Sequence, residues 1–124
     1  MEEYIQVFTT TEKKDEAEMI ARKLLEKRLA GCIQVIGPLT SSYWWRGRIE
    51  TAEEWVCLIK SKKALYARIE EAIKEVHSYE TPEIVAVPVV AGSADYLGWL
   101  RSELKEENDQ DGEINVNQDQ GGGG

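Results

Sequence analysis

The sequence predicts one small α+β domain over residues 1–105, with the element order β-α-β-β-α-β-α. Three observations predict it. Short β-rich runs alternate with segments of helical apolar spacing, a long aromatic hairpin lies mid-chain, and the composition changes abruptly after Lys105. A chain of 124 residues with 42% hydrophobic residues can bury one modest core.

The N-terminal part predicts a strand followed by an amphipathic helix. Residues 4–8 form the β-rich run, and Asp15 with Glu18 fits an N-cap and its capping-box partner. Gly31 is expected to end the helix in the left-handed conformation, which suits a residue without a Cβ. The apolar residues of this helix recur at the spacing of one helical face: Ala17, Ile20, Ala21, Leu24, Leu25 and Leu29.

The middle of the chain predicts a long hairpin. Residues 32–36 and 40–45 form its first arm, interrupted at Gly37-Pro38, and residues 48–60 form the return arm. Arg46-Gly47 supplies the two-residue turn. Because Trp44 and Trp45 are adjacent, they should point to opposite faces of a strand. One of them is therefore expected to face a neighbouring subunit.

The second half predicts helix, strand and helix. Apolar spacing over residues 65–76 indicates a helix that stops near His77, and residues 83–90 form a strand in which Pro88 favours an edge position or a bulge. A last helix follows Gly92 and Ser93. Two β-α-β crossovers joined by a hairpin describe a ferredoxin-like βαββαβ unit with a C-terminal helix, whose antiparallel sheet carries helices on one face only. The uncovered face and the aromatic hairpin favour an oligomer.

Charge excludes a nucleic-acid partner. The net charge is −8, and six of the 23 acidic residues follow Lys105, so the domain balances 17 acidic against 15 basic residues and has no basic field. The apolar runs are too short for a membrane span, and the first residues lack the pattern of a signal peptide. Cys32 and Cys57, without CxxC spacing, are expected to be buried free thiols, which suits a cytoplasmic location.

Residues 106–124 are expected to be a disordered acidic tail with a Gly-rich end. Residues 107–114 follow the first eight positions of a calcium loop, but Gln118 stands where a bidentate Glu is required. Disorder is therefore favoured over calcium binding.

Few residues carry chemistry by their pattern alone. His77 is the single histidine, more often a solvated or hydrogen-bonded group than a ligand; Glu80 and Glu83 could add oxygen ligands, or could simply be surface carboxylates. Lys60 ends an apolar strand, where snorkelling or an ion pair is favoured over binding of an anion at a subunit cleft. Nucleophile motifs and phosphate loops are absent from the sequence, so an enzyme is not expected.

Several segments together resemble one known family. They are EKRLAGCIQVIGPLTSSYWWRGRIE, LIKS, HSYETPEIVAVPV and DYLGWL, which between Val7 and Leu104 resemble the CutA divalent-cation tolerance proteins in order and spacing. The resemblance implies a ferredoxin-like subunit, a tight homotrimer formed through sheets and hairpins, a cytoplasmic setting, and a link to copper or another divalent cation. It also implies kinship with trimeric nitrogen-regulatory signal proteins, whose ligands bind between subunits.

The resemblance carries over unevenly to possible metal ligands. His77 matches the histidine of the family's His-Pro-Tyr-Glu stretch, a position associated with copper, although Ser78 replaces the proline. Val76 and Phe8 stand where some bacterial members have a second histidine and a strand cysteine, so two proposed ligands are missing. The expected metal residues are His77, Glu80 and Glu83, holding a cation weakly that folding does not require.

The expected function is that of a non-enzymatic, homotrimeric copper or divalent-cation binding protein. Two alternatives stay open: a small-molecule sensor with its site between subunits, and a purely structural, stable trimer. Residues that match the family at positions resembling an intersubunit cleft are Tyr43, Trp45, Lys60, Tyr79 and Trp99.

Overall fold

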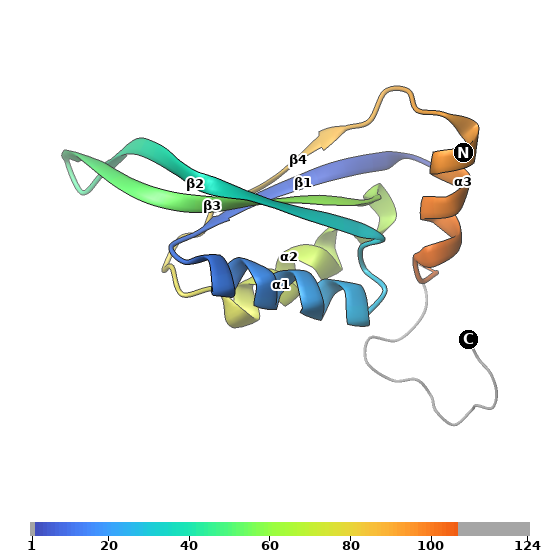
Figure 1. Cartoon of the computed structure of the whole chain (residues 1–124), viewed down its shortest axis with the longest axis horizontal. Helices are drawn as coiled ribbons and strands as arrows, with labels where there is room; N and C mark the ends of the chain where they lie inside the picture. The colour runs from blue at the N-terminus through green and yellow to red at the C-terminus, as the bar shows by residue number, and fades with distance from the viewer. Residues whose placement is uncertain (1, 107–124) are drawn as a thin grey trace.

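The computed structural model describes residues 2–106 and confirms the predicted α+β architecture (Figure 1). Four antiparallel strands form one sheet in the order β2-β3-β1-β4. The elements in chain order are β1 (Tyr4–Thr11), α1 (Lys14–Glu26), β2 (Cys32–Trp45), β3 (Arg48–Lys62), the 3-10 helix η1 (Lys63–Leu65), α2 (Tyr66–Val76), β4 (Ile84–Pro88) and α3 (Ala94–Glu103).

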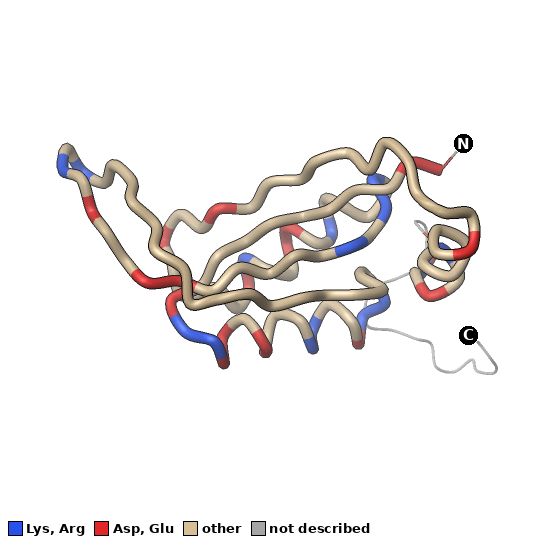
Figure 2. The backbone as a smooth tube through the Cα atoms, turned by 45° about the horizontal axis from the view of Figure 1, so that its top comes forward, with Lys and Arg blue, Asp and Glu red and all other residues tan. Residues whose placement is uncertain are grey.

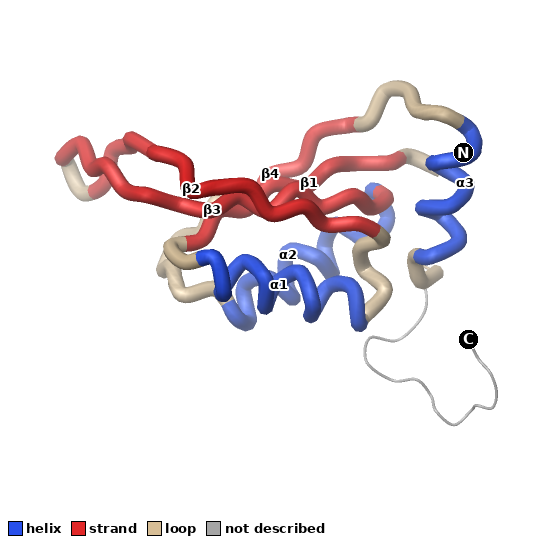
Figure 3. Tube along the Cα trace, viewed as in Figure 1, coloured by secondary structure: helices blue, strands red, loops and turns tan. Residues whose placement is uncertain are grey.

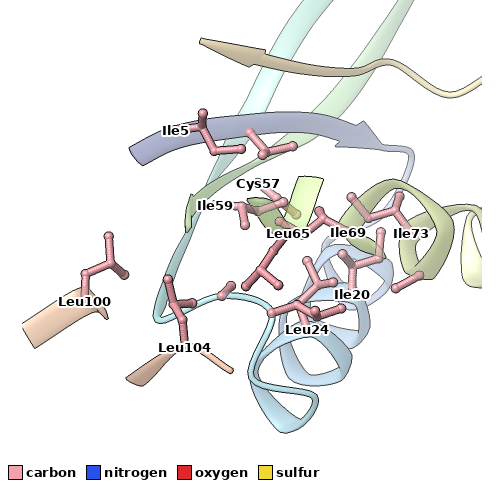
Figure 4. Packing of buried hydrophobic residues seen from close by; sticks show 14 of the residues in the cluster. Ile5, Ile20, Leu24, Cys57, Ile59, Leu65, Ile69, Ile73, Leu100 and Leu104 are labelled. Carbon is pink, nitrogen blue, oxygen red and sulfur yellow. The ribbon is translucent and has the colours of Figure 1, made fainter. Parts of the chain in front are cut away.

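Helices α1 and α2 cover one face of the sheet, whereas α3 lies at one end of it (Figure 3). Burial along β1 alternates, so that Ile5, Val7, Thr9 and Thr11 face the helices and the residues between them are half-buried. Val7 pairs with Ile59 in this layer. The core between sheet and helices consists of aliphatic side chains from both layers, joined at one end by leucines of the α3 segment (Figure 4).

No helix of residues 2–106 covers the opposite face of the sheet, and we call it the open face (Figure 1). Strand alternation and register assign its residues. They are Tyr4, Gln6, Phe8, Thr10, Cys32, Gln34, Ile36, Val56, Leu58, Lys60, Lys62, Val85 and Val87. Aliphatic side chains on its outer strands are strongly exposed, with Ile36 at 52% and Val85 at 46%.

The ends of α1 differ from the prediction. The helix begins at Lys14, and its N-cap residue Lys13 makes no side-chain cap, so Asp15 lies in the first turn instead of capping it. A carboxylate in the first turn still interacts favourably with the helix dipole. At the other end the left-handed residue is Arg28, with φ of 59°, and not Gly31.

Gly31 has a different role, because it lets α3 pack closely. A Cβ on Gly31 would lie 2.6 Å from Leu100 Cδ1. Leu100 is buried and belongs to the core. The glycine at this position therefore serves close approach of two segments and not helix termination.

The predicted hairpin is confirmed and is continuous apart from one irregularity. The register of β2 against β3 shifts between Ile36 and Leu39, where the sequence places Gly37-Pro38. Arg46 and Gly47 both have positive φ, 53° and 80°, as a type I′ turn requires. Since β1 pairs with β3 only as far as Trp55, residues 39–54 project beyond the sheet (Figure 1). We call this projection the arm.

Strand β4 lies at the edge of the sheet, as Pro88 favours, and pairs with β1 alone. It is shorter than the predicted residues 83–90. The acidic tail and its calcium-loop motif lie outside the described residues, apart from Glu106. None of the helices within residues 2–106 is long and apolar enough to cross a membrane.

Candidate functional site

His77 follows the last residue of α2 and lies in the protein interior. Its side chain is fully buried, and its Nε2 lies 2.7 Å from the carbonyl oxygen of Thr10. The backbone N–H of Tyr79 donates to Nδ1 at 3.1 Å. Because Nδ1 accepts a hydrogen bond, the proton of the neutral ring resides on Nε2, which donates to Thr10. Both ring nitrogens are therefore engaged.

Glu16 of α1 ties the loop after α2 to the helix layer. One carboxylate oxygen accepts the backbone N–H of Ser78 at 2.7 Å, and the other accepts the Ser78 hydroxyl at 3.1 Å. The first oxygen also lies 3.7 Å from Nδ1 of His77. A proline at residue 78 would lack both of these donors, so serine allows two hydrogen bonds here that proline would exclude.

Tyr79 connects the same loop to the base of the arm. Its hydroxyl donates to Oε2 of Glu54 at 2.7 Å, and Glu54 is only 5% exposed. Burial, followed by this hydrogen bond, raises the pKa of Tyr79 above its usual value. The ring centroids of His77 and Tyr79 lie 5.0 Å apart. The loop is thus held at His77, Ser78 and Tyr79 in succession.

The tip of the arm also contacts this loop. The guanidinium of Arg46 pairs with Glu80 at 3.2 Å and lies over the Trp45 ring, 5.2 Å from its centroid. The Glu80 side chain is exposed, as an ordinary surface ion pair would be. Glu83 is exposed as well.

The three expected metal residues are not gathered into a ligand cluster. Within residues 2–106, no group of three or more His, Cys, Asp or Glu side chains is placed to hold a metal ion. A cation at His77 would have to replace a hydrogen bond to Thr10 or to the Tyr79 amide, because imidazole binds metal through an unprotonated nitrogen. In this conformation His77 does not fit a metal, and the ligand set stays a prediction.

The five expected cleft residues fall into two groups at opposite ends of the sheet. Tyr43 and Trp45 belong to the arm, and Tyr79 lies beside it. The charge of Tyr43 is close enough to Tyr79 to help raise the Tyr79 pKa. Lys60 lies beside Cys32 at the far end of the hairpin. Tyr43 pairs with Glu50, and ten strand residues from there to Lys60 span about 33 Å.

Trp99 belongs to the group at the far end. Its ring centroid lies 5.6 Å from that of Tyr96 on the same helix. Burial, with a smaller contribution from the neighbouring Cys32 thiol, raises the pKa of Tyr96. Tyr96 is thus adjacent to Cys32, which pairs across the strands with Lys60. One chain alone does not bring these two groups into a single cleft.

Lys60 makes no ion pair in residues 2–106, which leaves snorkelling as the other role that the sequence favoured. Its ammonium donates to Oε1 of Gln34 at 2.7 Å, and within residues 2–106 no carboxylate lies within 4.0 Å of it.

Both cysteines are free, as expected, but only Cys57 is fully buried. Burial raises the pKa of Cys57 to about 11, which leaves the thiol protonated and unreactive at neutral pH.

The sequence did not indicate the two carboxylates that hold the loop. Strand alternation gives no signal of burial for Glu54, because it has the parity of Val56 and Leu58 and not that of the buried Cys57 and Ile59. Glu16 offers no such signal, because an acidic residue in the first turn of a helix is ordinary.

Comparison with known proteins settles the family. The model of the CutA1 divalent ion tolerance protein family matches residues 5–103. This chain belongs to that family. It is 38% identical over 94 residues to the divalent-cation tolerance protein CutA of Archaeoglobus fulgidus, covering 76% of this chain and 91% of the relative. It is 39% identical over 94 residues to human CutA, of which it spans only 52%.

Solved structures of the family agree with the fold. The periplasmic divalent cation tolerance protein CutA of Archaeoglobus fulgidus superposes with a TM-score of 0.80 at 35% identity, covering 82% of this chain and 99% of that one. Rice CutA1 superposes with a TM-score of 0.82 at 31% identity, covering 84% and 95%. The resemblance predicted from the sequence motifs is therefore confirmed.

Proposed function

We propose that this family member acts in divalent-cation tolerance as a non-enzymatic homotrimer, formed through the arm and the open face. The supporting observation is the apolar surface of the arm. Trp44 is 72% exposed and its cross-strand partner Ile49 is 65% exposed. A soluble monomer rarely presents so large an apolar pair on a projecting hairpin, whereas a second copy would cover it.

The test of assembly is the mass of the protein in solution. Sedimentation equilibrium at micromolar concentration is expected to give three times the chain mass of 14.0 kDa. A mass of one chain would contradict the proposal, and a mass of two chains would contradict the trimer.

Copper or another divalent cation is the proposed ligand, with His77, Glu80 and Glu83 as its ligands. We expect weak binding, because the His77 ring must first give up a hydrogen bond. Copper titration of the assembled protein should show binding that His77→Ala weakens by roughly tenfold or more. Thr81→Ala, in the same exposed loop, is the control and should bind as the wild type does; equal binding by His77→Ala would remove the assignment.

A small-molecule site between subunits is the second candidate. It is favoured by the separation of Tyr43, Trp45 and Tyr79 from Lys60 and Trp99, because two copies are needed to bring such groups together. A ligand bound there would stabilise the assembly by mass action.

We propose a cytoplasmic setting, which the free cysteines favour, although the rice relative is named as chloroplastic and the Archaeoglobus structure as periplasmic.

A further inference from the structure

The open face carries one charge without a counter-charge. Strand alternation places two charged residues, Lys60 and Lys62, on this face. The two lysines that follow it on the same strand and in η1 each lie near a carboxylate: Lys62 is 4.0 Å from Glu2, and Lys63 is 3.5 Å from Glu3. The described part of the chain offers Lys60 only the amide oxygen of Gln34.

The groups around Lys60 are neutral hydrogen-bonding side chains. Gln6 of β1 and Cys32 of β2 are its direct cross-strand partners, and Gln34 receives its hydrogen bond. Each glutamine amide keeps two N–H donors when its oxygen accepts. Figure 2 shows that the strands carry few charged residues between the arm and the end near α3. The surroundings of the ammonium therefore supply donors and no negative charge.

Covering the open face makes this arrangement costly. An ammonium removed from water without an opposite charge loses its hydration and gains nothing equivalent from an amide. An anion beside Lys60 would restore the balance, and the glutamine amides could donate to it. The same assembly that covers the apolar residues thus calls for a negative group at this point.

Aromatic rings stand next to the charge. Tyr96 lies beside Cys32, and it contacts Trp99 with 5.6 Å between ring centroids. Both rings are partly exposed, at 41% and 43%. Flat rings of this kind contact planar, apolar groups favourably.

We propose that Lys60, with the amides of Gln34 and Gln6, binds the carboxylate of a small planar organic acid, whose apolar body contacts Tyr96 and Trp99. This proposal rests on the proposed assembly, which covers the site. It names the ligand class of the intersubunit cleft and assigns the arm group, Tyr43, Trp45 and Tyr79, to the far wall contributed by another copy.

The experiment compares benzoate with benzamide, its neutral isostere, and with inorganic phosphate, all at constant ionic strength. Sedimentation and thermal unfolding are measured for the wild type, Lys60→Met and Lys63→Met. Methionine keeps the apolar stem and removes the charge, and Lys63 is an exposed control close to Lys60 in sequence. We expect benzoate to raise the unfolding midpoint saturably in the wild type and in Lys63→Met, with at least tenfold weaker binding by Lys60→Met and no effect of benzamide.

Each other outcome overturns the proposal in a distinct way. If the wild-type protein is a trimer that does not respond to benzoate, the organic acid is excluded as the ligand, while the proposed assembly still holds. A trimer that needs Lys60 but ignores benzoate indicates a carboxylate of a neighbouring copy. An equal response to phosphate removes the planar acid as the ligand class, and a monomeric wild type removes the proposed assembly itself.

Discussion

At the scale of single residues, the loop after α2 is determined by donors and acceptors that the sequence alone did not reveal. His77 uses both ring nitrogens within the chain, and Ser78 and Tyr79 each bond to a carboxylate of another element. The sequence indicated His77 as a candidate because of its residue type and family position. Its burial could not be foreseen, since it depends on the distance of β1 from the end of α2.

Ser78 offers a direct test of this loop. Ser78→Pro removes the backbone N–H and the hydroxyl that bond Glu16, and we expect it to destabilise the fold by about 2 kcal/mol. Ser78→Ala removes only the hydroxyl and should lose about 0.5–1 kcal/mol. His77 already has the extended backbone that precedes a proline, so the added ring does not strain it. Urea unfolding measures both variants, and equal stability of the two would contradict the role of the Ser78 amide.

Tyr79 gives the stability a dependence on alkaline pH. Because burial and Glu54 raise its folded-state pKa above the usual 10.0, the unfolded chain loses the phenolic proton first. The contribution of Tyr79 to the free energy of unfolding is therefore fully present below pH 10 and falls as the pH rises above that value. The pKa values of Cys57, Tyr66 and Tyr96 are raised in the fold too. The free energy of unfolding therefore still falls with rising alkaline pH when Tyr79 is replaced.

The measurement for Tyr79 is the free energy of unfolding between pH 9 and pH 11. Tyr79→Phe should be less stable than the wild type at neutral pH and should lose stability less steeply above pH 10. A variant whose slope matches the wild type would show that the phenol does not titrate differently on unfolding.

At the scale of elements, apolar periodicity predicted the helices and strands well, and their ends less well. The stripe from Ala17 to Leu24 does face the sheet, and Arg46-Gly47 is the turn. The end of α1 was misread because Gly31 was taken as a helix terminator. Its real constraint is contact with Leu100, almost seventy residues away, and no local pattern reports such a contact.

Two glycines make a matched pair for testing that contact. Gly31→Ala would place a Cβ 2.6 Å from Leu100 Cδ1, and we expect a loss of about 1–3 kcal/mol because the buried Leu100 side chain must repack. Gly98→Ala lies within α3 and has nothing within 4 Å of its added Cβ, so it should stabilise the helix by about 0.5–1 kcal/mol. Thermal unfolding measures both variants. We expect the unfolding midpoint to fall for Gly31→Ala and to rise for Gly98→Ala.

At the scale of the whole molecule, one chain leaves a large apolar surface uncovered. Two layers bury the face under α1 and α2, while the open face and the arm keep large apolar side chains in water. The sequence predicted this imbalance from adjacent tryptophans and the absence of a second helical layer. It could not predict which tryptophan is free, because Trp45 is partly covered by Arg46 and Trp44 is not.

The most direct test of the central claim is the sedimentation mass of a Trp44→Glu variant. A charge at this position should prevent the arm from packing on another copy, and the expected result is loss of the trimer at micromolar concentration. The control is Met19→Glu, which charges a similarly exposed apolar residue on α1, at 54% exposure, and should remain trimeric. A Trp44→Glu protein with the mass of the wild-type trimer would contradict assembly through the arm.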